Sequence, residues 1–303
     1  MGIRIAAVVV TFNRIDLLKS CIYSLQNQSR KLDEIIIVNN SSTDGTYEWL
    51  NEQRDLTVIT QSNTGSAGGQ YTGIKSAYDK GYDWIWSLDT DVIPEKNALE
   101  MFLASDVIKD NSVGFLSSII FTPDNSLSYI NIPYLEDGNS IINSVTKLND
   151  LVIQSASFGS VLFSRNAVKN VGYPIPDFFI WGDDVEYTFR MREKGFMGYL
   201  ISKSKAIHFE KNNFQNPFLE MNYSDNKAFY AVRNTIYILK LRGRILYKSK
   251  IRGIGSSFRF YFSTVFGRLK RKNLDFTSLI KFSRYFLLGL VYNPRKYLKH
   301  ETN

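Results

Sequence analysis

The strongest constraint on the fold is an alternation of two patterns through the first 120 residues. Short apolar runs rich in β-branched residues lie at 5–10, 34–38, 57–60 and 84–88. Between them, apolar residues recur at helical spacing, as from Leu17 to Leu25. A continuous apolar run is typical of a parallel strand covered on both faces. The order therefore predicts an α/β sheet that places ligand-binding groups at the carboxyl ends of its strands.

Past residue 120 the alternation weakens. Residues 121–150 mix Asn, Ser, Asp and Pro with scattered Ile and Tyr, which predicts a long loop or an edge ribbon that helps to choose the ligand. The ordered segments that we predict beyond it are an extended stretch over 156–163, a helix over 183–194 and a strand over 196–201. From Asp225 onward the pattern is helical.

The charge is divided unevenly along the chain. Residues 1–224 hold 19 Lys and Arg against 26 Asp and Glu, whereas residues 225–303 hold 18 against 3, a net +15. We therefore predict a sheet domain over 1–224 and a basic helical region over 225–303. A region this basic favours a polyanionic partner, either a nucleic acid or an anionic membrane surface.

Composition excludes several classes of protein. The single cysteine, Cys21, rules out a disulfide framework and a thiolate metal cluster. The chain opens directly into the first apolar run, so we expect no signal peptide. No stretch approaches the roughly 18 apolar residues that span a bilayer. Any contact with a membrane is therefore expected at its surface.

An acidic turn, Asp89-Thr90-Asp91, follows the fourth apolar run. Alternate residues at a strand end point their carboxylates in nearly one direction, which suits a hard divalent cation and a diphosphate. An isolated turn of this kind is usually solvated, but this one closes a strand where such sheets bind ligands. His208 is either structural or a neutral imidazole that completes a carboxylate metal site.

A second acidic cluster, Trp181-Gly182-Asp183-Asp184-Val185-Glu186, opens the predicted helix over 183–194. A helix cap needs one acid, whereas this segment has three. The preceding residues 178–181 are apolar and largely aromatic, which indicates a walled pocket where a carboxylate acts as a general base. A solvated, capped first turn is the alternative. The glycine-rich segment 65–69 is a weaker signal, because it fits neither nucleotide-binding fingerprint; we predict a loop that allows close approach of a ligand.

Several motifs occur in a fixed order along the chain. They are VVTFNR at 9–14, NNSSTDGT at 39–46, NTG at 63–65, DTD at 89–91, WGDDVE at 181–186 and FYAVRN at 229–234. The set resembles family 2 of the inverting glycosyltransferases over about residues 3–212, and the motif at 229–234 is similar to a segment that often follows in these enzymes. Within that family it is most similar to bacterial galactofuranosyl- and rhamnosyltransferases. The resemblance implies the GT-A fold, a Rossmann-like mixed sheet flanked by helices, here followed by a basic helical extension.

The resemblance also implies roles for individual residues. Those expected at the nucleotide-sugar donor are Thr11, Phe12, Arg14, Asn39, Asn63, Asp89 and Thr90. Those expected at the acceptor are Trp181, Asp183 and Glu186, with Asp184 as the catalytic base. Those expected to hold Mn²⁺ or Mg²⁺ are Asp89, Asp91 and His208. Asn39 stands where many members have Asp, and the Gln/Arg-x-x-Arg-Trp signature of processive members is absent, which favours transfer of one or a few sugars.

The implied enzyme is a metal-dependent, inverting hexosyltransferase. It would move galactofuranose from UDP-galactofuranose to a lipid-linked bacterial surface glycan, such as an O-antigen, capsule or cell-wall polysaccharide, at the cytoplasmic face of the inner membrane. A rhamnosyltransferase that uses dTDP-rhamnose is the alternative. Two other classes are a nucleotidyltransferase and a non-catalytic membrane or glycan scaffold. A nucleotidyltransferase normally has a glycine-rich basic loop, and residues 10–14 lack the glycines. A scaffold would not need the acidic residues of the two clusters, all of which are present.

The basic region contains an apolar helical stripe. It is formed by Phe258, Tyr261, Phe262, Val265, Phe266 and Leu269, and the basic cluster Arg268, Lys270, Arg271 and Lys272 follows at once. An aromatic stripe beside basic residues is the signature of a helix that lies on an anionic membrane. The alternative is packing against the catalytic domain or another subunit of a homo-oligomer. No nucleic-acid partner is expected, because no recognised module accompanies the charge.

Overall fold

A computed structural model of the chain describes residues 2–135, 150–209, 216–223 and 225–295. The chain divides into two compact units, one taking in residues 1–176 and 184–213 and the other residues 177–183 and 214–303. We call them the sheet unit and the helical unit. The short segment 177–183 thus belongs to the helical unit, although its neighbours in sequence on both sides belong to the sheet unit.

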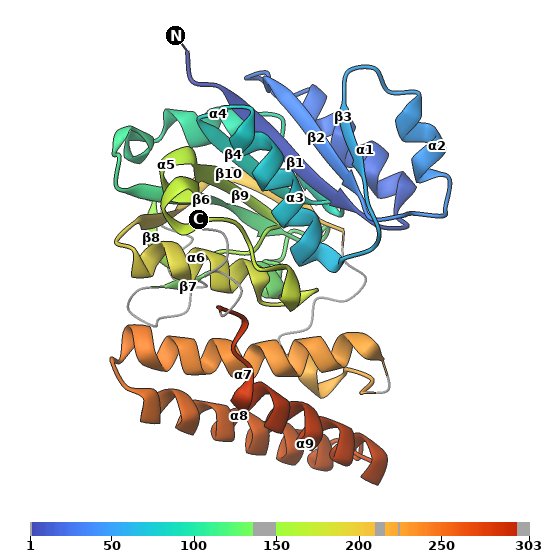
Figure 1. Cartoon of the computed structure of the whole chain (residues 1–303), viewed down its shortest axis with the longest axis vertical. Coiled ribbons are helices and arrows are strands. Elements are labelled where there is room, and N and C mark those ends of the chain that lie inside the picture. The colour runs from blue at the N-terminus through green and yellow to red at the C-terminus, as the bar shows by residue number, and fades with distance from the viewer. Residues whose placement is uncertain (1, 136–149, 210–215, 224, 296–303) are drawn as a thin grey trace. The chain divides into compact units, whose positions relative to one another are not determined.

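The sheet unit alternates strands and helices, as the sequence predicts (Figure 1). In chain order its elements are β1 (Ile5–Thr11), α1 (Ile15–Gln26), β2 (Glu34–Asn39), α2 (Thr46–Asn51), β3 (Thr57–Thr60), α3 (Gly65–Asp79), β4 (Trp84–Asp89), β5 (Val92–Pro94), α4 (Ala98–Ala104), β6 (Val113–Phe121), the 3-10 turn η2 (Tyr129–Asn131), β7 (Tyr134–Leu135), β8 (Leu151–Ser155), β9 (Ser160–Ser164), α5 (Arg165–Val171), α6 (Asp183–Glu193) and β10 (Met197–His208). The first four strands match the predicted runs to within one residue at each end.

The described strands form one mixed sheet. Their order is β3-β2-β1-β4-β9-β6-β10-β8-β7, and β5 pairs with β10 off this path. Strand β1 pairs in parallel with both β2 and β4, whereas β9 runs antiparallel to β4 and β6. The predicted α/β class with a mixed sheet is confirmed. Because β1, β2 and β4 are parallel neighbours, their carboxyl ends lie together at one edge.

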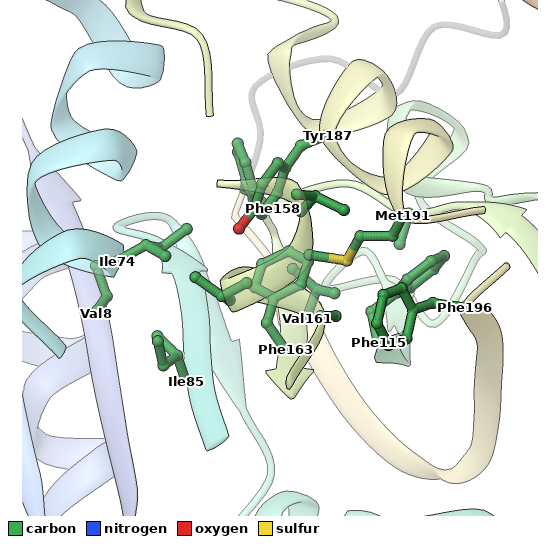
Figure 2. Packing of buried hydrophobic residues seen from close by; sticks show 14 of the residues in the cluster. Val8, Ile74, Ile85, Phe115, Phe158, Val161, Phe163, Tyr187, Met191 and Phe196 are labelled. Atoms are coloured by element: carbon green, nitrogen blue, oxygen red, sulfur yellow. The ribbon is translucent and has the colours of Figure 1, made fainter. Parts of the chain in front are cut away.

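Alternation along β1 explains why the strand is apolar throughout. Ala6 and Val8 enter the hydrophobic core on one face of the sheet, and Ile5, Ala7 and Val9 enter the core on the other. Figure 2 shows part of the first core, where aromatic rings from β6, β9 and α6 pack with a methionine. Both faces of the strand are therefore covered, as parallel strands require.

The glycine-rich segment is not a loop, and our prediction on this point is wrong. Gly65 is the first residue of α3, so the glycines form the first turns of that helix. A Cβ atom at Gly69 or Gly73 would overlap with the side chain of Val10 or Val8 on β1. The glycines therefore let α3 pack closely against the central strand. Glycines needed for close packing and glycines needed for ligand binding look alike in a sequence, which is why the prediction failed.

Two strands differ from the sequence-based boundaries. Only the second half of the stretch over 156–163 is a strand, since β8 ends at Ser155 and β9 begins at Ser160. Strand β10 continues seven residues past its predicted end to His208, across a register shift between Ile201 and Lys205. The polar run 202–205 is not typical of a buried strand, so the sequence pattern ended the strand too early. In the structure Ser204 is buried and donates to the carbonyl of Ala98. Residues 136–149 of the predicted loop lie outside the described residues.

Over its described residues the helical unit contains three long helices, which confirms the helical pattern predicted from Asp225. They are α7 (Asn226–Leu246), α8 (Lys250–Lys270) and α9 (Phe276–Val291), labelled in Figure 1. Each begins at an Asp or Ser whose side chain accepts a hydrogen bond from the first turn. Among the described residues, no helix combines the length and apolar character needed to cross a membrane.

Candidate active site

Three of the residues that we predict at the donor lie at the carboxyl ends of neighbouring strands. Thr11 at the end of β1 is in register with Asn39 at the end of β2, and Asp89 at the end of β4 is in register with Val10. Parallel pairing therefore brings Thr11, Asn39 and Asp89 to one edge of the sheet, the position where open α/β sheets bind ligands.

Two polar atoms at this edge are buried without a hydrogen-bond partner in the described part of the chain. They are Oγ1 of Thr11 and Nδ2 of Asn39. The residues are 1% and 0% exposed. The amide of Asn39 is oriented by its Oδ1, which accepts a hydrogen bond from the Ser42 backbone N–H at 3.0 Å. An unsatisfied buried polar group costs about 1–3 kcal/mol, so this pair indicates a place where a ligand supplies the missing partners.

The loops that follow β1 and β2 are joined to each other. Asn13 has a left-handed φ of 52°, and its backbone N–H donates to Ser42 Oγ while its Oδ1 accepts from the Thr43 N–H. Beside them, the ring of Phe12 is 45% exposed. Asn63 has a different partner, since its Oδ1 accepts a hydrogen bond from the Gly65 N–H at the start of α3. Hydrogen bonds thus hold the two loops at this edge together, and the ring of Phe12 is exposed beside them.

The acidic turn after β4 is held against β10. The Thr90 hydroxyl donates to the Val10 carbonyl, and the Asp91 carbonyl accepts from the Phe209 N–H at 2.8 Å. Strand β5, which follows the turn, pairs antiparallel with the end of β10 so that Val92 faces His208. The imidazole Nε2 of His208 therefore lies 3.5 Å from Oδ2 of Asp91. The structure brings together two of the three predicted metal ligands.

Asn131 of η2 and Ser128, the residue before η2, orient the His208 ring. Nδ1 of His208 lies 2.8 Å from Oδ1 of Asn131 and 3.3 Å from the hydroxyl of Ser128. An amide oxygen only accepts, so we assign a proton to Nδ1, and this contact turns Nε2 toward Asp91. Asn131 and Ser128 were not identified from the sequence, because they lie in the segment 121–150 whose pattern gave no separate signal.

The charges at this edge are strongly coupled. Burial raises the pKa of Asp89 to about 7, and the charges of Asp91 and Asp184 add to the rise. Burial acts in the same direction on Asp91, but the hydrogen bond with His208 and the charge of Arg14 outweigh it and lower the pKa of Asp91. Arg14 also forms an ion pair with Asp91. Two buried carboxylates that repel one another are a site where a cation is favourable.

The donor atoms at this edge suit a divalent cation. Carboxylate oxygens from Asp89 and Asp91 favour Mg²⁺ and Mn²⁺, and a neutral imidazole oriented through Nδ1 is the usual form of a histidine ligand. Within the residues that the structure describes, no group of three or more His, Cys, Asp and Glu side chains is gathered closely enough to hold a metal ion. Asp91 and His208 are in contact, whereas the relation of Asp89 to them is electrostatic, since their charges shift its pKa.

Asp184 lies near the start of α6 in the sheet unit. Burial raises the pKa of Asp184 to about 6, although hydrogen bonds from the backbone of Val185 and Phe158 oppose the rise. Glu186, which we predict at the acceptor, is fully buried and lies 3.2 Å from the guanidinium of Arg190. Of the two carboxylates, the structure leaves only Asp184 partly exposed.

The loop that precedes α6 is held within the helical unit by α7. Phe179, Trp181 and Gly182 all have positive φ, between 62° and 82°. The side-chain amide of Asn234 donates to three loop carbonyls, those of Phe178 at 3.0 Å, Ile180 at 2.9 Å and Trp181 at 2.8 Å. Asp183, the last residue of this loop segment, is 4% exposed.

Arg233 completes this contact. Its Nε donates to Oδ1 of Asn234 at 2.9 Å, which orients the amide so that its nitrogen faces the loop. Its Nη2 donates to the Asp177 carbonyl at 2.8 Å. The sequence contained a signal for this pair in the motif at 229–234, but the motif gave no indication of which residues it would contact.

Comparison with known proteins agrees with this geometry. A family model described as Glycosyl transferase family 2 matches residues 6–171, more than half of the chain. The protein named Galactofuranosyltransferase GlfT1 from Mycolicibacterium smegmatis is 28% identical over 256 residues, which cover 79% of this chain and 84% of that protein. The chondroitin synthase of Pasteurella multocida is 23% identical over 82% of this chain, but over only 28% of its own length.

A solved structure confirms the fold. The crystal structure of GalNAc-T7 with UDP, GalNAc and Mn²⁺ superimposes with a TM-score of 0.59 at 14% identity. The match covers 78% of this chain and 47% of that one, so this chain spans about half of its length. The predicted GT-A architecture is therefore shown by an independent structure.

Proposed function

This chain belongs to glycosyl transferase family 2, and from this premise we propose that it transfers galactofuranose from UDP-galactofuranose, with inversion, to a lipid-linked bacterial surface glycan. The reaction would take place at the cytoplasmic face of the inner membrane. The similarity to a galactofuranosyltransferase over most of both chains supports the choice of sugar. The structural observation that supports a pyrimidine nucleotide donor is the pair of polar atoms at the carboxyl ends of β1 and β2 that have no hydrogen-bond partner among the described residues.

The pair suits a pyrimidine base. The Thr11 hydroxyl donates or accepts and the Asn39 amide nitrogen donates, while a uracil ring offers carbonyl oxygens and a ring N–H. The exposed ring of Phe12 beside them provides a face on which a base can stack. Thymine presents the same polar atoms, so this contact selects a pyrimidine diphosphate and the sugar is selected elsewhere.

The acidic turn is the place for the diphosphate. Asp89, Asp91 and His208 would hold Mn²⁺ or Mg²⁺, and such an ion neutralises the charge that develops on a departing diphosphate. The chain itself fixes the ligands. The Asn131 contact holds the imidazole with Nε2 toward Asp91, and the β5–β10 pairing holds Asp91 in place. Arg14 forms an ion pair with Asp91 and adds positive charge at the same position.

Asp184 is the proposed base. Its carboxylate accepts the proton of the acceptor hydroxyl while that oxygen forms a bond to the anomeric carbon. The bond from the anomeric carbon to the diphosphate oxygen breaks, and UDP leaves with the electron pair. Attack from the face opposite the leaving group inverts the anomeric configuration. A base whose pKa is raised toward neutrality accepts a proton more readily than an ordinary Asp, and such catalysis contributes roughly 10²–10⁴-fold.

A donor panel tests the proposal. The purified chain is incubated with UDP-galactofuranose, dTDP-rhamnose, UDP-N-acetylglucosamine or UDP-N-acetylgalactosamine, each with Mn²⁺, Mg²⁺ or EDTA, and the released nucleotide is quantified by chromatography. We expect UDP release from UDP-galactofuranose at least tenfold faster than from any other donor, and its loss in EDTA. Faster turnover of dTDP-rhamnose would show that the proposed donor is wrong, and unchanged turnover in EDTA would show that the proposed metal dependence is wrong.

A further inference from the structure

Helix α8 presents an exposed apolar stripe along its whole length. The stripe consists of Ile251, Ile254, Phe258, Phe262, Phe266 and Leu269, which are between 42% and 82% exposed. At about 100° per residue these positions fall within roughly 120° of the helix circumference. The opposite side of α8, with Ser257 and Thr264, is buried within the helical unit. The stripe is thus a continuous surface.

Helix α9 carries a second stripe of the same kind. It consists of Phe276, Ile280, Leu287 and Val291, which are between 52% and 79% exposed. In contrast, Phe282 and Phe286 on the other side of α9 belong to the core of the helical unit. Side chains of this size are seldom exposed in such numbers on one small unit, and contiguous patches of them mark interaction surfaces.

Basic residues flank the α8 stripe. Arg252, Arg259 and Lys270 are exposed and lie about 80–100° around the helix from its centre, so they form a row along one side. The helices α7, α8 and α9 contain no Asp or Glu. The surface is therefore apolar and cationic, with no acid on any of its helices.

A pocket of about 600 Å³ lies within the helical unit at one end of these stripes. Its basic lining residues are Lys240, Arg244, Lys250 and Arg295, and its apolar lining includes Ile254 and Val291. Ile254 belongs to the α8 stripe and Val291 to the α9 stripe, so the pocket adjoins both. The Lys240 ammonium is fixed by the carbonyls of Gly289 and Leu290 at 2.8 and 2.5 Å.

We propose that the helical unit docks on an anionic lipid bilayer and that this pocket receives a phosphate-bearing lipid headgroup. The stripes match the acyl region near the headgroups, and the basic row matches anionic lipid. The basic residues other than Lys240 that line the pocket, Arg244, Lys250 and Arg295, match a phosphate. A second copy of this chain would fit less well, because it would bring an equally basic surface against this one. The proposal does not depend on which sugar the enzyme transfers.

Vesicle flotation with the full chain tests the proposal. Vesicles are made of phosphatidylcholine alone or of phosphatidylcholine mixed with phosphatidylglycerol. We expect flotation with the mixed vesicles at low salt and its loss at high salt or with phosphatidylcholine alone. The triple variant R252Q, R259Q, K270Q should lower the partition coefficient about 100-fold, at about 1 kcal/mol per charge. The control K109Q, K169Q, K194Q removes the same charge from exposed positions of the sheet unit and should not change it.

Two further variants separate the stripe from the pocket. F262S with F266S should reduce flotation to both vesicle types, whereas the matched control Y23S, on an exposed aromatic of the sheet unit, should not. R244Q with K250Q should reduce the preference for phosphatidylglycerol and leave apolar binding intact. UDP affinity measured on every variant shows that the sheet unit is folded.

Three results would overturn the proposal. The first is absence of flotation by the wild-type chain. The second is a concentration-dependent dimer, seen by light scattering, that F262S with F266S dissociates, since a second copy would then be the occupant. The third is binding of inorganic phosphate or pyrophosphate that R244Q with K250Q abolishes without any change in flotation, since the pocket would then take a free anion and not a headgroup.

Discussion

Replacing Asn234 with alanine should release the loop that leads into α6. The amide of Asn234 makes three hydrogen bonds to carbonyls of this loop. The amide nitrogen has two N–H groups, which share the three contacts. At a net 0.5–1.5 kcal/mol per N–H group, their loss should lower the free energy of unfolding by about 1–3 kcal/mol. Two non-glycine residues of the loop, Phe179 and Trp181, have positive φ, a conformation that costs about 1–3 kcal/mol per residue and persists only when contacts maintain it.

The consequence for catalysis differs from the consequence for donor binding. The loop continues directly into α6, whose second residue is Asp184. Relaxation of the loop should therefore lower kcat by tenfold or more. The affinity for UDP should stay the same, because Thr11 and Asn39 lie in the sheet unit. Steady-state kinetics, calorimetry with UDP and urea unfolding measure the three quantities on the same preparation.

An aspartate at the same position gives the sharper test. N234D keeps the size of the side chain, but its carboxylate can only accept hydrogen bonds and would face three carbonyl oxygens. We expect N234D to be less stable than N234A. The exposed Asn226 in the same helix provides the control, since N226A should leave both stability and kcat unchanged. If N234D were as stable as the wild-type chain, the amide would not hold the loop and the reasoning would be refuted.

Four other predictions follow from the structure. D184N should retain UDP affinity in calorimetry and lose more than nine-tenths of kcat, and a variant above that level would exclude Asp184 as the base. Because only the deprotonated carboxylate accepts a proton and burial raises its pKa to about 6, kcat/KM of the wild-type chain should fall about tenfold per pH unit below about 6. T11V should weaken UDP binding about threefold to tenfold without lowering the melting temperature, because it removes a buried hydroxyl that has no protein partner in the described residues. G73A should lower stability in urea by about 1–3 kcal/mol, because its Cβ would overlap with Val8, whereas G255A, which meets no atom within 4 Å, should not.

The sheet was predictable because its signals are local. A parallel strand covered on both faces must be apolar throughout, and Ile5–Thr11 shows this in its sequence alone. The errors arose where tertiary contacts override the local pattern. Glycines in α3 serve close packing against β1, and the polar run 202–205 stays in β10 through buried serine contacts. Neither the packing of these glycines nor the contacts of these serines can be read from the neighbouring residues in the sequence.

The edge of the sheet that carries the candidate site was predictable for a geometric reason, and the contacts around it were not. Once β1, β2 and β4 are parallel neighbours, Thr11, Asn39 and Asp89 must share an edge. The partners of His208 come from residues 77 and 80 positions away in the sequence, so no spacing rule identifies them. The same holds for Asn234, which is more than 50 residues from the loop that it holds.

The acidic residues that open α6 differ in their surroundings, and helical periodicity explains the difference. Positions 184 and 186 of a helix differ by about 200°, so the side chains of Asp184 and Glu186 leave α6 on nearly opposite sides. Position 190 is one turn beyond 186, and the Arg there pairs with Glu186 inside the protein. The carboxylate of Glu186 therefore contributes to the packing of α6, whereas the partly exposed Asp184 keeps a carboxylate whose pKa burial has raised toward neutrality. The structure thus gives Glu186 a buried ion pair, while its predicted contact with the acceptor and the predicted role of Asp184 as the base stay predictions.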